Sequence, residues 1–97
     1  MSHLDQLDHN VLDLASRGFY QVGWHPVYET WAFHSVTLRP VADLEVRALL
    51  RLEVEGYVRF PDKERWVPVQ LTDSGRAVRR VSAALAATET PQKESWQ

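Results

Sequence analysis

The stretch from residue 40 to residue 80 constrains the fold more than any other part of this 97-residue chain. Residues 43–55 contain no glycine or proline and are rich in leucine, alanine, arginine and glutamate, which are good helix formers. Val46, Leu49 and Leu52 recur at three-residue steps, so they fall on one side of such a helix. The segment therefore predicts an amphipathic helix with one face for a core.

The residues after this helix have the order of a β-hairpin and a further helix. Gly56 provides a helix end, because a left-handed capping position favours a residue without a Cβ. Residues 57–60 and 66–71 are rich in β-formers and flank a polar turn. A threonine and an aspartate, either of which can cap a helix, then precede an alanine-rich run at 74–87. We expect a hairpin followed by an amphipathic helix.

This order closely resembles the C-terminal half of the bacterial winged-helix regulators of the MarR and PadR type. The residues that match their recognition-helix pattern are Val46, Leu49, Leu52, Gly56, Tyr57 and Val58, and a Leu-Thr-x-x-Gly-Arg motif follows the hairpin. The resemblance implies an α+β fold, a winged helix-turn-helix that is mainly helical with a two- or three-stranded β-wing. It also implies a transcriptional regulator that binds duplex DNA through the recognition helix, about 43–56, and the wing, about 57–71.

The region between the first helix and the recognition helix has two interpretations. Residues 19–33 hold most of the aromatic residues of the chain. A winged-helix regulator should have a short second helix here, and residues 27–34 could form it. Alternatively, 19–24 and 28–36 are strands on either side of a His-Pro pair, in which case the helix-turn-helix is incomplete.

The same aromatic residues have a structural and a functional explanation. A small domain buries large rings because each removes a large area from water. Tryptophan and tyrosine are also over-represented in the energetically important parts of protein interfaces. We therefore predict a homodimer or partner interface formed by Trp24, Trp31, Val78, Val81 and Leu85.

Length and composition indicate one domain. Residues 4–16 predict a first helix that Gly18 ends, the winged-helix domain is expected to span 1–87, and the polar segment 88–97 is expected to be a flexible tail. No apolar run approaches the length of a membrane span, so no membrane partner and a cytoplasmic location are expected. The chain lacks cysteine and any catalytic constellation, so we expect no metal, no cofactor and no enzymatic activity.

Charge bears directly on DNA binding. The net charge is -2 at pH 7, whereas compact DNA-binding domains are often clearly basic. Within 39–80, however, basic residues slightly outnumber acidic ones. The residues expected to contact a DNA groove or its phosphates are Arg39, Arg47 and Arg51 on the helix side and Lys63 and Arg65 at the wing tip.

Acidic residues lie among these cations and support a second hypothesis. Asp43, Glu45 and Glu55 share the helix with the arginines, and a face of mixed charge is common on solvated helices. The alternative function is a winged-helix protein-protein interaction module that does not bind DNA and uses its acidic and aromatic surface.

Overall fold

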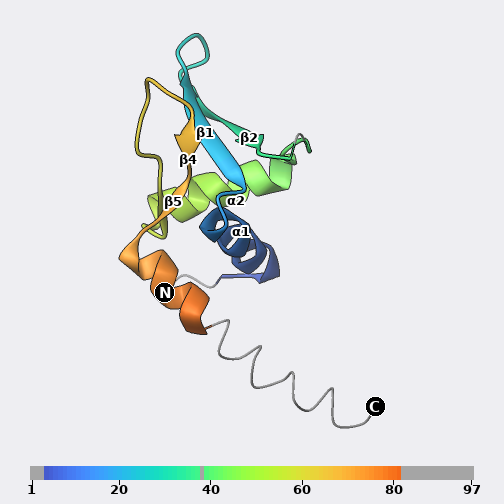
Figure 1. Cartoon of the computed structure of the whole chain (residues 1–97), viewed down its shortest axis with the longest axis vertical. Helices are drawn as coiled ribbons and strands as arrows, with labels where there is room; N and C mark the ends of the chain where they lie inside the picture. Colours follow the sequence, from blue (N-terminus) through green and yellow to red (C-terminus); the bar gives the residue numbers. More distant parts are fainter. Residues whose placement is uncertain (1–3, 38, 82–97) are drawn as a thin grey trace.

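The computed structural model describes residues 4–37 and 39–81, which form an α+β fold of helices and small antiparallel sheets (Figure 1). The elements in chain order are α1 Gln6–Ser16, β1 Tyr20–His25, β2 Thr30–Ser35, α2 Asp43–Val54, β3 Val58–Arg59, β4 Val67–Pro68 and β5 Gln70–Leu71. Residues 73–81 are also helical. The α+β class is confirmed, whereas the predicted tail, 88–97, and Leu85 lie outside the described residues.

A reciprocal cap starts α1. The Asp8 N–H donates to Oδ1 of Asp5 at 2.9 Å, and the Asp5 N–H donates to Oδ2 of Asp8 at 3.1 Å. This capping box satisfies two N–H groups that the first turn would leave unpaired, so the helix begins at Gln6, two residues after the predicted start at Leu4. It ends before Gly18, whose φ of 74° is the left-handed conformation expected there.

Residues 20–35 form a β-hairpin, so the prediction of a short helix at 27–34 is wrong and the two-strand alternative is confirmed. β1 and β2 pair antiparallel along their whole length. The physical reason is burial: Tyr20 and Val22 point to one side and are completely buried, which a strand achieves by alternation. A helix-turn-helix is therefore incomplete in the described residues.

The segment after α2 joins two small sheets. β3 pairs with β5, with Val58 opposite Leu71, so the predicted hairpin is confirmed. β4 instead pairs with β1, with Val67 opposite Val22, and the larger sheet has the order β2-β1-β4. One short stretch of chain thus connects the N-terminal hairpin to the strand that follows α2.

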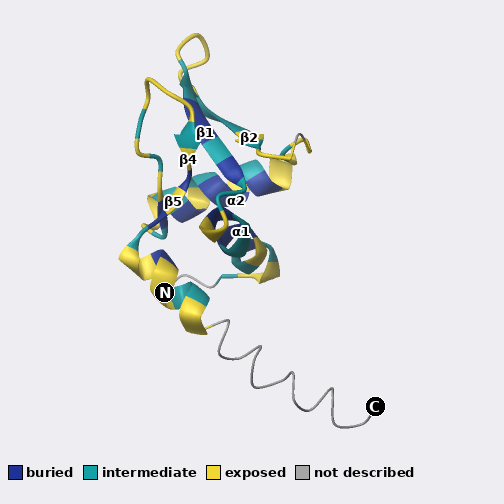
Figure 2. Ribbon diagram, in the orientation of Figure 1, coloured by how far each residue is buried: buried dark blue, intermediate teal, exposed yellow. Residues whose placement is uncertain are grey.

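The core lies where α1, α2 and the hairpin meet (Figure 2). Leu49 and Leu52 are completely buried, as their spacing predicts, and Val46 is half-buried. The other buried apolar residues are Val11, Leu12, Ala15, Tyr20, Val22, Ala48, Val58, Val69 and Leu71. Gly75 sits so close to the chain that an added Cβ would lie 2.0 Å from the Tyr57 carbonyl oxygen, so the helix at 73–81 is held against the end of α2.

Side chains of the loop 60–66 pack on both faces of the β1–β2 hairpin. The Phe60 ring lies 5.0 Å from Trp31 and 5.4 Å from Phe33 between ring centroids, on the face that also carries Val22. Trp66 packs over Gly23 on the opposite face, where its ring occupies the position that a Cβ would need. The aromatic residues therefore serve mainly as packing within the chain, which is the structural explanation of their density.

Candidate nucleic-acid interface

α2 separates a buried face from an exposed one. Ala48 and Leu49 face the core, whereas Arg47 is exposed and makes no ion pair with any residue that the structure describes. Leu44 and Val54 are also exposed, at 62% and 82%. Of the cations predicted on this helix, Arg47 is thus the one whose guanidinium is fully available to a ligand.

Arg51 links α2 to α1. Its Nη2 donates to Oδ1 of Asp8, whose side chain is 1% exposed, while the Arg51 side chain remains 46% exposed. A buried carboxylate without a partner would be costly, so this arginine has a structural task. An arginine carries five N–H donors, however, and the exposed part of the guanidinium can still reach a phosphate.

Arg39, which is exposed, contacts a pair of buried residues, Glu45 and Tyr20. Its Nη1 and Nη2 donate to the two carboxylate oxygens of Glu45, each at 3.0 Å, and the Tyr20 hydroxyl donates to the same carboxylate. The Ala42 N–H donates a further bond at 3.3 Å, so the carboxylate also caps α2. Glu45, predicted as a surface acid that could contact a partner, is only 8% exposed.

The network fixes the charge states of its members. Hydrogen bonds from Arg39, more than from any other group, lower the pKa of Glu45 to about 2. Burial, followed by the hydrogen bond to Glu45, raises the pKa of the Tyr20 hydroxyl. The contact with Glu45 also raises the pKa of Arg39. At neutral pH the network therefore contains one carboxylate, one guanidinium and one neutral phenol.

The cations of the loop are exposed but have partners within the chain. The Lys63 ammonium lies 4.2 Å from the centre of the Trp24 ring, a cation–π contact. The Arg65 guanidinium is 3.3 Å from the Asp62 carboxylate, and a hydrogen bond from the Glu64 N–H lowers the pKa of that carboxyl. The loop therefore differs from a wing whose cations have no partners within the chain.

The residues predicted for a dimer interface are placed unequally. Trp24 and Trp31 stack edge-on at 5.2 Å, and Trp31 and Val78 pack against the core. Val81, at 61% exposed, is the member of this set that offers apolar surface, and Leu85 lies outside the described range.

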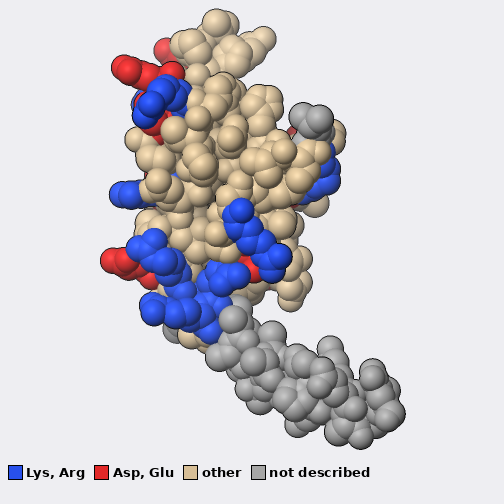
Figure 3. Space-filling view, viewed as in Figure 1, with Lys and Arg blue, Asp and Glu red and all other residues tan. Residues whose placement is uncertain are grey.

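Sequence reasoning missed a concentration of arginines at the end of the molecule that lies away from the β1–β2 hairpin. Figure 3 shows Lys and Arg side chains gathered at the lower end of the described part, beside α1 and the helix at 73–81. The residues involved are Arg17, Arg59, Arg76, Arg79 and Arg80. The signal available in the sequence was the spacing of Arg76, Arg79 and Arg80, which places three cations on neighbouring turns of one helix.

Among the described residues, no helix is both long and apolar enough to cross a membrane. The geometry thus consists of one unpaired arginine on α2, cations of the helix side and loop with intramolecular partners, and an arginine-rich surface elsewhere. No protein-family model, no curated protein and no solved structure matches this chain.

Proposed function

We propose that this protein is a small cytoplasmic winged-helix transcriptional regulator that binds duplex DNA. The observation that carries the proposal is α2, which buries one face completely and presents Arg47 on the other. The antiparallel pair β3 and β5 follows at once, and β1 joins β4, which is compatible with a wing connected to a strand after the first helix. The hairpin of β1 and β2 lies between α1 and α2, where a winged-helix regulator would have its second helix.

The contacts of the other cations define their roles in this proposal. Arg39 and Arg51 keep 47% and 46% of their side chains exposed, so each holds a structural acid with part of its guanidinium and offers the rest to phosphate. Lys63 and Arg65 reach the flanking backbone from the loop. Arg47 is the candidate for reading a base, since an arginine can bind guanine with two hydrogen bonds.

A salt series measures this directly. We expect a labelled duplex of random sequence to bind at about 50 mM salt and to lose affinity steeply as salt rises to about 200 mM, because phosphate contacts release counterions. Arg47→Ala should cost about 1 to 3 kcal/mol, mainly on a preferred sequence, whereas a change at Lys63 should weaken binding to all sequences. Fluorescence anisotropy at each salt concentration provides both quantities.

A wild-type chain without salt-sensitive affinity at low salt would overturn the DNA proposal. It would leave the alternative, a protein-protein interaction module, for which the exposed apolar residues at the two ends of α2 are the specific observation. Leu44 and Val54 flank Arg47 there, and Asp43 and Glu55 add negative charge. Val54, at 82% exposed, has no role in reading a base, whereas a partner protein would cover its apolar surface.

The regulator is further proposed to act as a homodimer. The helix at 73–81 supports this through Val81, whose exposure leaves apolar surface for a second copy, while the tryptophans contribute less because they pack within the chain. We expect light scattering to give the mass of two chains at tens of micromolar, and Val81→Asp to give the mass of one. A wild-type monomer at that concentration would reject the dimer without affecting the DNA proposal.

A further inference from the structure

A cluster of arginines lies outside α2 and the loop. A groove runs between the end of α1, strand β5 and the helix at 73–81, and we call it the arginine groove. It consists of three adjoining hollows of about 310, 460 and 260 Å³, and all of them are lined by Leu71 and Arg76. The remaining groove residues used below are Gln70, Arg59, Asp73, Arg79 and Arg80.

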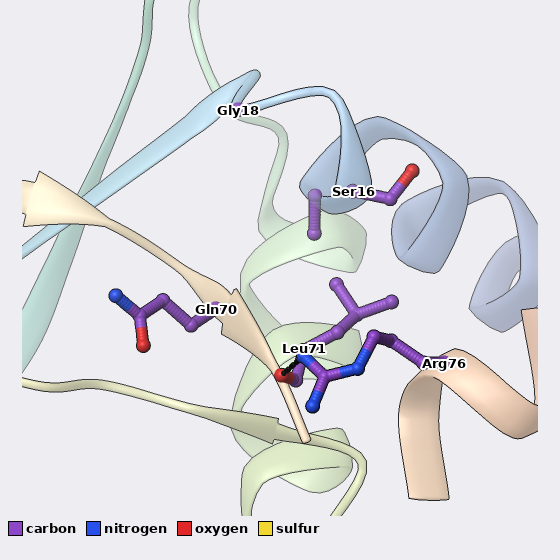
Figure 4. Close-up of a pocket in the computed structure, with 6 residues that line it drawn as sticks. Ser16, Gly18, Gln70, Leu71 and Arg76 are labelled. Carbon is purple, nitrogen blue, oxygen red and sulfur yellow. Dashed lines mark hydrogen bonds between the residues drawn. The ribbon is translucent and has the colours of Figure 1, made fainter. Parts of the chain in front are cut away.

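Backbone and side-chain contacts hold several of these arginines in place. Arg76 donates from Nη1 to the Leu71 carbonyl oxygen at 2.9 Å, so its guanidinium lies along the groove wall (Figure 4). Arg59 donates from Nε and Nη2 to the Gln70 side-chain oxygen, at 2.9 and 2.6 Å. These two acceptors are uncharged, so the contacts fix the position of both guanidiniums. Arg76 also pairs with a carboxylate, that of Asp73, whereas Arg59 has no ion pair with a described residue and keeps its full charge.

The acids near the groove compensate only part of its charge. Asp13 accepts from Arg79 at 2.8 Å and lies 3.2 Å from Arg17, and Asp73 pairs with Arg76. Arg80 is exposed and has no ion pair with a described residue. The Nε of Arg79 is buried and lacks a hydrogen-bond partner. The groove therefore keeps an excess of positive charge and unused donors in a chain whose net charge is -2.

We infer that the arginine groove binds the phosphodiester backbone of the DNA, as a second contact surface in addition to α2. The inference rests on the proposed function and deepens it. An extended polyanion fits better than a small anion, because the arginines are spread along the groove: Arg76 lines all three hollows, whereas Arg80 lines one of them and Arg59 another. Arg76 and Arg80 are one helical turn, about 6 Å, apart, which suits successive phosphates of one strand.

This assignment explains how a chain with a net charge of -2 can still bind DNA. Arg51 on α2, Arg65 in the loop and Arg39, which precedes α2, are each paired with a carboxylate, so those surfaces contribute little net positive potential. In the groove, Arg59 and Arg80 have no ion pair with a described residue and supply the positive potential instead. Contacts of the groove to the DNA backbone position the protein without reading sequence. Sequence preference then depends on Arg47.

Two exposed helix arginines provide a matched comparison. Arg80→Gln and Arg47→Gln each remove one charge from a position without an ion pair to a described residue, so both variants should melt like the wild type. On a random duplex, Arg80→Gln should reduce the slope of log affinity against log salt by about 0.9, and Arg59→Gln combined with Arg80→Gln by about 1.8. Arg47→Gln should instead lose affinity selectively on a preferred sequence.

The outcomes separate the groove from the proposed function. If the wild type binds DNA and the double variant keeps its salt slope, the groove assignment is overturned and DNA binding through α2 stands. If the wild type shows no DNA affinity, both the groove assignment and the proposed function fail. Amide NMR shifts on adding the duplex supply the second measurement: shifts along 70–80 support the groove, whereas shifts confined to 43–54 reject it. If inorganic phosphate alone shifts the same amide signals to the same extent, the groove binds free phosphate, and the inference is also overturned.

Discussion

Replacing Glu45 with alanine is expected to lower the free energy of unfolding by about 2 to 4 kcal/mol, because it leaves a buried hydroxyl without an acceptor and a helix without its cap. The carboxylate is 8% exposed and accepts bonds from Arg39, from the Tyr20 hydroxyl and from the Ala42 N–H. Without it, a completely buried phenol keeps an unsatisfied hydroxyl, and α2 loses the group that caps its first turn. Urea denaturation followed by tryptophan fluorescence measures the change.

The control is an acid on the same helix that has no such contacts. Glu55 is exposed at the C-cap of α2, so Glu55→Ala should change stability by no more than about 0.5 kcal/mol. Similar losses in the two variants would contradict the network. Tyr20→Phe adds a second comparison, because it removes the hydroxyl together with its need for a partner and should cost less than Glu45→Ala.

The same prediction has a pH signature. The pKa of Glu45 falls from the ordinary 4.5 to about 2 in the folded chain, mainly through hydrogen bonds from Arg39. Because the folded value is the lower one, the stabilisation is fully present above pH 4.5 and disappears as the pH falls through 2. The full effect is on the order of 3 kcal/mol at 1.36 kcal/mol per pKa unit. Glu45→Gln should remove this part of the acid dependence.

The fold was predictable where local pattern and tertiary packing agree. The residues of α2 have a clear helical period, and Gly18 and Gly56 both adopt the left-handed φ expected at helix ends. The hairpin at 20–35 remained ambiguous because its alternating aromatics and its short length suit either a strand or a helix turn. What decides between them is the burial of Tyr20 against Glu45, a contact across 25 residues that no local pattern contains.

The site was less predictable than the fold, because spacing along a helix does not show which charges have partners. Arg51 was expected on a DNA-facing surface, yet it pairs with Asp8, a residue 43 positions away. Glu45 stood among surface acids and is buried. Conversely, the sequence does not indicate that Arg59 and Arg80 belong to one surface, because they line the same groove only once β3 and the helix at 73–81 are folded.

Leu49→Ala is expected to destabilise the protein by about 2 to 5 kcal/mol, the range for truncating a completely buried leucine. The side chain lies in the core with residues of α1 and β1, and its removal leaves a cavity that these elements can fill only partly. Arg47→Ala, two residues earlier and exposed, should stay within about 0.5 kcal/mol. Equal shifts in the thermal melting curves would reject the helical phase of α2.

The pair also connects stability to binding, because the rotation of α2 about its axis sets both. If Leu49 faces the core, Arg47 must project to the other side, so the two variants should fail in opposite assays. At a temperature where most of the Leu49→Ala chain is folded, it should bind DNA with nearly wild-type affinity per folded molecule. Arg47→Ala should melt normally and lose its preferred sequence. A Leu49→Ala protein that is folded but loses sequence preference would show that the DNA face depends on the core of α2, and the division of this helix into two independent faces would be wrong.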